Sequence, residues 1–228
     1  MKPWEDLRRS VGAISNKRSL VHISLLFVLL MARTSNAAGN DSGFFFESDK
    51  NSRLTLLWYD GYRLASHSFG VMSREVESIF SEIGVEVCWH DGSHGLWRRN
   101  EPPNSIEIRL VLLPVDSADW GHEEQVMGAA VKNLETPAQT HMVYVFFPNV
   151  LRALGLDSDD VRSPGKWRQI ARALGRVLAH EIVHAIAPEN PHRDEGLMGR
   201  QLRRSILVKR ELRLDPVTAK ALRLKLQT

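Results

Sequence analysis

Residues 165–187 have the apolar spacing of one long helix that packs against a core. Apolar side chains recur every four positions and form a single stripe, made of Ile170, Leu174, Leu178, Ile182 and Ile186. Ser163-Pro164 precedes the stripe in the order of an N-cap followed by a proline at the first helical position, and Pro188 ends it. The sequence therefore predicts a long, buried helix around which the other elements must be arranged.

Two histidines and a glutamate lie in this predicted helix, in the motif HEIVH of residues 180–184. His180 and His184 are four residues apart, so both imidazoles project from one helix face, which is the spacing that holds two corners of a zinc ion. Glu181 lies one step round the helix, where its carboxylate can reach a metal-bound water without being a ligand. The alternative interpretation is a buried helix whose histidines are only packed, which leaves the desolvation of Glu181 uncompensated.

A third ligand must come from outside the helix, because three protein ligands and a water molecule are typical of catalytic zinc. His192 is the nearest candidate in the sequence, and the change of direction after Pro188 can bring it back over the helix end. Glu189, Asp194 and Glu195 are the competing candidates.

The run HEIVHAIAPENPHRDEGLM, residues 180–198, resembles the zinc signature of the metzincin-type metallopeptidases, HExxHxxGxxH followed by a methionine turn. It is more closely similar to a group of bacterial secreted metzincin-like proteins of mostly uncharacterised function. The resemblance implies that His180, His184 and His192 bind Zn²⁺, that Glu181 is the general base, and that Met198 is the turn methionine beneath the metal.

The chain departs from the family pattern in three places. The third histidine follows the second by eight residues, where six is common. The glycine at which the chain turns is absent, and Pro188 follows the helix instead. Asn190 is a candidate for the positive φ that such a turn needs. Some metzincins also carry a tyrosine after the methionine that helps to stabilise the oxyanion, whereas the last tyrosine here is Tyr144.

The remaining patterns predict an α+β protein. Strand-like runs cover 54–59, 86–89, 106–113, 127–131 and 142–147, and helical spacing covers 71–83, 149–154 and 216–226. The resemblance implies a zincin/metzincin-like fold, in which a mixed twisted sheet packs on the long helix that carries HExxH. It also implies that the edge strand near 127–131 lines the cleft and binds an extended peptide by strand addition. We expect residues 53–228 to form a single catalytic domain with C-terminal helices.

The N-terminus has the pattern of a targeting segment. Residues 1–18 are polar and basic, 19–32 are apolar over a length typical of a signal peptide, and 35–37 offer a cleavage site. We expect residues 1–37 to be a signal peptide, with an uncleaved N-terminal anchor as the alternative, and 38–52 to be a flexible segment. The predicted location is secreted or periplasmic.

The basic character of the whole chain belongs largely to this leader. The chain has 30 basic and 27 acidic residues, of which residues 1–37 hold six and two. The remaining 24 basic and 25 acidic residues leave a net charge of −1, which gives no argument for nucleic-acid binding. We expect a monomer with no membrane span in the mature chain.

Three other features are read as structural. Cys88, the single cysteine, lies in the apolar run 85–89 and is expected to be a buried small hydrophobe. His90 and His94 are four apart but lie among loop-forming residues, so a second metal site is not expected. The basic run 200–213 is expected to be a solvated face of closing helices, with attraction to an anionic polymer or membrane as the alternative.

Together these patterns predict an exported zinc-dependent metallopeptidase that hydrolyses peptide bonds of a peptide or protein substrate through a zinc-bound water activated by Glu181. One alternative is a non-catalytic, zinc-stabilised protein that binds a peptide or polymer on the same scaffold. Another is an effector or toxin that acts on a second cell, with the same chemistry and a different target.

Overall fold

The computed structural model describes residues 52–92, 106–132, 141–163 and 165–226. The predicted leader and all but the last residue of the predicted flexible segment lie outside these ranges, so both remain predictions. In the described part of the chain, no helix is long and apolar enough to cross a membrane.

A five-stranded mixed sheet forms the base of the fold, in the order β2-β1-β3-β5-β4. The strands are β1 (Ser52–Tyr59), β2 (Val85–Asp91), β3 (Ile106–Leu113), β4 (Gly128–Lys132) and β5 (His141–Phe146). Strands β2, β1, β3 and β5 are parallel, and β4 pairs antiparallel with β5 at one edge. The twisted mixed sheet agrees with the predicted α+β class. All five predicted strands are present, and their ends lie within one or two residues of the expected positions.

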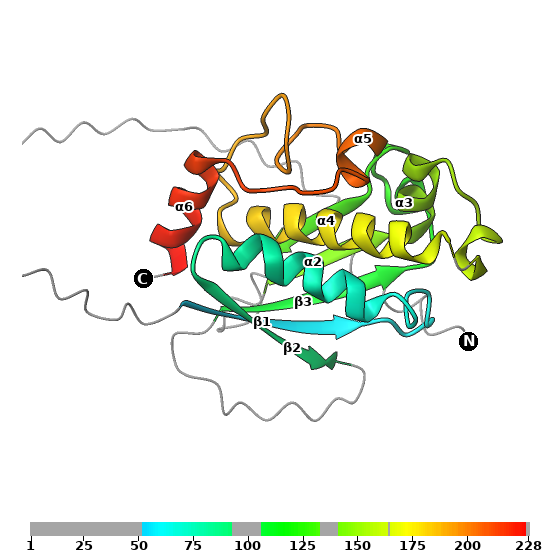
Figure 1. Ribbon diagram of the computed structural model, residues 1–228, viewed down its shortest axis with the longest axis horizontal. Helices are drawn as coiled ribbons and strands as arrows, with labels where there is room; N and C mark the ends of the chain where they lie inside the picture. Colours follow the sequence, from blue (N-terminus) through cyan, green and yellow to red (C-terminus); the bar gives the residue numbers. More distant parts are fainter. Residues whose placement is uncertain (1–51, 93–105, 133–140, 164, 227–228) are drawn as a thin grey trace, which may run out of the picture. The chain divides into compact units, whose positions relative to one another are not determined.

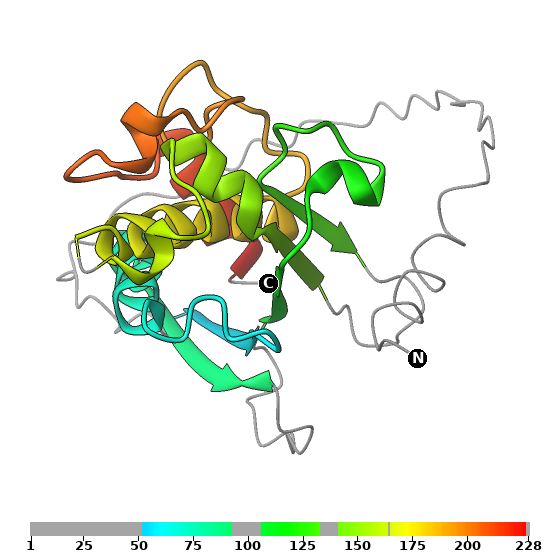
Figure 2. The ribbon, with the colours of Figure 1, turned by 90° about the vertical axis from the view of Figure 1, so that its right-hand side faces the viewer.

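The helices cover one face of this sheet. They are α2 (Phe69–Ser81), α3 (Phe147–Leu154), α4 (Trp167–Ile186), α5 (Arg204–Leu207) and α6 (Pro216–Leu226), with short 3₁₀ helices at Ser117–Trp120 and Asp160–Arg162. Figures 1 and 2 show α2 and α4 side by side on the sheet, and the segment after α4 running back along α4 on the side away from the sheet. The predicted long helix that carries HExxH is α4.

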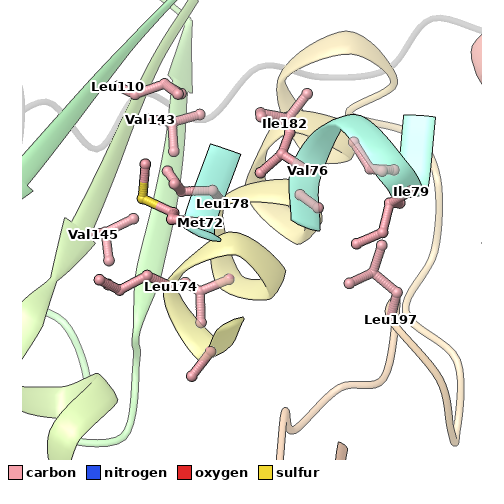
Figure 3. Close-up of a cluster of buried hydrophobic side chains, with 14 of the residues drawn as sticks. Met72, Val76, Ile79, Leu110, Val143, Val145, Leu174, Leu178, Ile182 and Leu197 are labelled. Atoms are coloured by element: carbon pink, nitrogen blue, oxygen red, sulfur yellow. The ribbon is translucent and has the colours of Figure 1, made fainter. Parts of the chain in front are cut away.

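The predicted apolar stripe of α4 forms the centre of the core. Figure 3 shows Leu174, Leu178 and Ile182 between side chains of α2 and side chains of β3 and β5. These three residues are at most 1% exposed, and full burial of a leucine or isoleucine contributes roughly 1.5–3 kcal/mol. A smaller apolar cluster of Leu113, Tyr144 and Phe146 packs with Trp120 apart from this core.

Gly175 allows the two main helices to approach closely. A Cβ atom at this position would lie 2.8 Å from the main-chain oxygen of Met72 and 2.9 Å from the Cβ of Glu75, which are both in α2. A glycine that weakens a helix in isolation is therefore required here by helix packing.

The structure corrects three details of the sequence analysis. Helix α4 begins at Trp167 with Lys166 as its N-cap, and Ser163 opens only a preceding turn, in which its oxygen accepts from the N–H groups of Lys166 and Trp167. Cys88 is only partly buried, because β2 is the outer strand opposite β4 and is incompletely covered. The run 200–213 is helical only over Arg204–Leu207.

A fully buried arginine of α4 joins three segments. The Nε of Arg176 donates to Oε1 of Glu75 in α2 at 2.8 Å. Its two terminal nitrogens donate to the main-chain oxygens of Ile206 at 2.5 Å and Lys209 at 2.6 Å. The side chain of Arg176 is 0% exposed, so these three acceptors compensate the desolvation of its charge.

We predict that Arg176→Ala lowers the free energy of unfolding by about 3–5 kcal/mol, because the change removes the donor that half-buried Glu75 and two carbonyl groups share. Urea denaturation followed by circular dichroism measures this loss. The matched control is Arg172→Ala, which removes a 41% exposed side chain 3.7 Å from the same glutamate and should cost less than about 1 kcal/mol. Equal losses in the two variants would contradict the assigned role of Arg176.

Candidate metal centre

Three histidine side chains converge at the C-terminal end of α4. His180 and His184 project from the helix, and His192 comes from the loop that follows it. One ring nitrogen of each lies within 4.8 Å of the others, and in the described residues these three form the group that can hold a metal ion. The Nε2 atoms of His184 and His192 are 3.1 Å apart, near the roughly 3.3 Å that two nitrogens show on tetrahedral zinc with bonds of about 2.05 Å.

A main-chain carbonyl fixes the tautomer of His180. Its Nδ1 lies 2.7 Å from the oxygen of Leu197. Because a carbonyl oxygen can only accept a hydrogen bond, Nδ1 carries the proton and Nε2 presents its lone pair to the site. This pairing is the outer-shell contact that a metal-bound histidine typically makes, and the sequence analysis did not identify its acceptor.

Burial keeps the two helix histidines neutral. Desolvation lowers the pKa of His180 to about 4, opposed by the hydrogen bond to Leu197. The pKa of His184 is also lowered, first by burial and then by the neighbouring His192. Neutral imidazole is the form that binds a metal ion, so this donor set fits Zn²⁺ near pH 7.

The three acidic competitors for the third ligand position lie outside this group. Glu189 is exposed and forms an ion pair of 3.0 Å with Lys225 of α6. Asp194 and Glu195 are exposed, and neither belongs to the group of potential ligands found among the described residues. The structure therefore places His192, and not these carboxylates, beside His180 and His184.

The loop that carries His192 is fastened to α6. Asn190 is buried, and its side chain donates to the Oγ1 of Thr218 at 3.2 Å. Thr218 in turn donates to Asp215 at 2.6 Å. The predicted positive φ at Asn190 is wrong, since Arg63 is the one described non-glycine residue with positive φ, and Gly196 has that conformation in this loop (φ 81°). Asn190 instead serves through its amide, as a brace between the loop and the last helix.

Met198 lies in the same loop, directly after the residue that binds His180. Its side chain is 1% exposed. The oxygen of Met198 accepts from the N–H of Arg193 at 2.7 Å, and the oxygen of Arg193 accepts from the N–H of Arg200 at 3.0 Å. This pairing closes the loop between His192 and Met198, and the buried side chain of Met198 belongs to the main hydrophobic core.

The edge strand β4 positions Glu181. The N–H of Ala130 donates to the Glu181 carboxylate, and burial raises the pKa of this carboxyl to about 8 in spite of that hydrogen bond. A Cβ atom at Gly128 would lie 2.6 Å from Cγ and 2.9 Å from Oε1 of Glu181. The glycine therefore leaves the space that Glu181 occupies, and the small residues of the run GAA at 128–130 were the one sequence signal of this contact.

The three histidines line a cleft of about 690 Å³. Its lining also includes Glu181, the segment 123–128 and the segment 199–204. The Oε1 of Glu181 is 4.0 Å from Nε2 of His180. The carboxyl group of Glu181 and the three imidazoles therefore line the same cleft.

Solved structures that are similar to this chain include two metalloproteinase-type proteins. Archaemetzincin from Methanopyrus kandleri matches with a TM-score of 0.45 and 13% identity, over 81% of this chain and 100% of that one. Metalloproteinase-II from Bacteroides fragilis matches with a TM-score of 0.45 and 13% identity, over 80% of this chain and 56% of that one. No protein-family model matches the chain, and no curated protein matches it. The roles of the site residues are therefore argued from the geometry of this chain.

We predict that the protein binds about one zinc ion per chain and that His192→Ala weakens this binding by more than the roughly 10–100-fold typical of outer-shell changes. Competition with a chromophoric chelator measures the affinity. Glu189→Gln is the matched control in the same loop, and it should leave the affinity unchanged. Loss of affinity in the control and not in His192→Ala would move the third ligand to Glu189.

We predict that Gly128→Ala destabilises the fold by about 1–3 kcal/mol, because the added methyl group overlaps the side chain of Glu181. In a Glu181→Ala background the same change should cost little, since the overlapping atoms are gone. A double-mutant cycle from urea denaturation measures this coupling. Equal costs in both backgrounds would show that Gly128 does not position Glu181.

Proposed function

We propose that this chain is an exported zinc-dependent metallopeptidase that hydrolyses peptide bonds. The observation that carries the proposal is the placement of the buried Glu181 carboxylate 4.0 Å from Nε2 of His180, beside the three converging imidazoles and within the cleft. The alternative is a packed helix in which these groups have no function. In that case the only hydrogen bond to offset the cost of burying Glu181 would be the one from the N–H of Ala130.

The chemistry follows from the groups present. His180, His184 and His192 would hold the metal, and a bound zinc ion supplies Lewis acidity and lowers the pKa of water toward 7. The positive charge of such an ion would also lower the pKa of Glu181 from the value of about 8 that burial gives it. In its ionised form Glu181 accepts a proton from the attacking water and passes it to the leaving amine. Its position against Gly128 limits the movement of the carboxylate between these two transfers. The thioether of Met198 is buried in the main core and has no proton to transfer.

Strand β4 offers a backbone on which an extended peptide can lie. The oxygen of Met127 accepts from Phe146 of β5, so the main-chain groups of Met127 and Ala129 face β5, and those of Gly128 and Ala130 face the opposite direction. The Ala130 N–H reaches Glu181, which places this free edge beside the general base. Strand addition along this edge would bring the scissile bond to Glu181.

A second function is favoured by one observation. In the described residues no tyrosine lines the cleft, and Tyr144 packs in the separate cluster with Phe146, where its hydroxyl lies 3.6 Å from the sulfur of Met142. An oxyanion-stabilising tyrosine is thus missing from the described site. A non-catalytic, zinc-stabilised protein that binds a peptide or polymer in the same cleft would need no such group.

Export is proposed from residues 1–37, whose basic start and apolar run have the pattern of a signal peptide. The protein would then act outside the cytoplasm, as a secreted or periplasmic monomer. An effector or toxin that acts on another cell would use the same site, and cleavage of proteins from a neighbouring species would identify it.

We predict that Glu181→Gln abolishes hydrolysis, by about 10²–10⁴-fold, and leaves one zinc bound, because the amide fills the same space but cannot accept the proton. The assay is cleavage of a mixed peptide library by the zinc-loaded protein, read by mass spectrometry, with zinc content measured on the same samples. If zinc-loaded wild-type protein released no more products than the Glu181→Gln protein, the result would contradict the peptidase and support the binding protein.

A further inference from the structure

The segment that follows Met198 places three arginines on one wall of the cleft. Arg200, Arg203 and Arg204 line it and are exposed. In the described ranges none of the three forms an ion pair, whereas Arg152, which also lines the cleft, is paired with Asp116 at 2.5 Å. A Cβ atom at Gly155 would lie 3.8 Å from Nη1 of Arg204, so this guanidinium lies at the end of α3. Arg200 and Arg203 are therefore the two exposed arginines without such a neighbour that line the cleft with the candidate metal centre. We call this segment, residues 200–204, the arginine wall.

The arginine wall is held in place from below. Arg200 is hydrogen-bonded through its N–H to Arg193, the residue after His192. Leu202 and Leu207 are buried in the core. Beyond the wall, the carbonyl of Ile206 is bound by the buried Arg176. The backbone of the wall is therefore fixed relative to the histidines, so its charges lie at a defined place along the cleft.

A second segment that lines the cleft carries the opposite charge. Glu123 and Glu124 are exposed and line the same cleft. Their segment is also held, because the buried amide of Asn149 donates to the main-chain oxygens of Glu124 at 2.9 Å and Val126 at 2.6 Å. A carboxylate that enters the cleft is repelled by this segment and attracted by the arginine wall, so its position in the cleft is determined.

We propose that the arginine wall selects substrates that carry a carboxylate near the scissile bond, so that the protein is a peptidase for acidic peptides. This inference rests on the proposed function of the same site. Guanidinium groups bind carboxylates through paired hydrogen bonds, and walls of low dielectric constant strengthen the attraction relative to open solvent. The carboxylate belongs either to an Asp or Glu side chain or to the C-terminus of the peptide.

The first experiment is a cleavage profile of the zinc-loaded full chain on a mixed peptide library, with Glu181→Gln as the blank. We expect Asp and Glu to be enriched at one position close to the cleaved bond. The best-cleaved peptide is then synthesised in three forms: unchanged, with its acidic residue replaced by the matching amide, and with an amidated C-terminus. The form that loses activity identifies which carboxylate the arginine wall binds.

The second experiment removes the charges. R200Q/R203Q should lower kcat/KM for the acidic peptide about tenfold and leave kcat/KM for its amide form within about twofold. E123Q/E124Q should raise kcat/KM for the acidic peptide, because it removes repulsion. The matched control is Arg210→Gln, which changes an exposed arginine that follows the arginine wall in the basic run 200–213 and does not line the cleft. It should change neither value.

The outcomes separate the two proposals. Cleavage without enrichment of acidic residues, or an acidic preference that survives R200Q/R203Q, would overturn the role of the arginine wall and leave the peptidase intact. Absence of any cleavage above the Glu181→Gln blank would overturn the peptidase, and with it the substrate class. Zinc content and circular dichroism of R200Q/R203Q identical to wild type would exclude loss of structure as the cause.

Discussion

The structure depends on the cost of burying polar side chains on α4. This helix carries Arg176, His180 and Glu181 in its buried part, and a helix interior offers them no partners because its own backbone groups are already paired. Each must recruit a partner from another segment. Arg176 binds main-chain oxygens of 206 and 209, His180 binds that of Leu197, and Glu181 binds the N–H of Ala130. The chain after α4 is thus fastened to it by polar contacts as well as by apolar packing.

Much of this arrangement follows from local sequence patterns. The four-residue stripe of α4, the strand-like runs and the motif HEIVH each depend on neighbours in the sequence, and they place the core and two of the three histidines correctly. The contact of His192 with His184 was expected from the turn after Pro188 and is present at 3.1 Å. The chemical roles of these residues remain predictions.

The partners of the site residues could not be read in the same way, because they are main-chain atoms or come from distant segments. The oxygen of Leu197 has no sequence signature, since every residue carries one. Gly128 and Glu181 are 53 positions apart, and their contact depends on the antiparallel pairing of β4 with β5. The helix start was wrong for another reason: Ser163 accepts from the N–H groups of Lys166 and Trp167 as the predicted cap would, but the regular helix begins only at Trp167, with Lys166 as its N-cap.

The brace between Asn190 and Thr218 sets the order in which the site can be assembled. The loop with His192 is held by a helix that lies 28 positions further along the chain. During synthesis from the N-terminus, α4 and its two histidines emerge first, and the third imidazole gains its support only when α6 has left the ribosome and docked. A nascent chain therefore passes through a stage in which the histidine group is incomplete, and any chemistry of the site begins only after nearly all of the domain has been made.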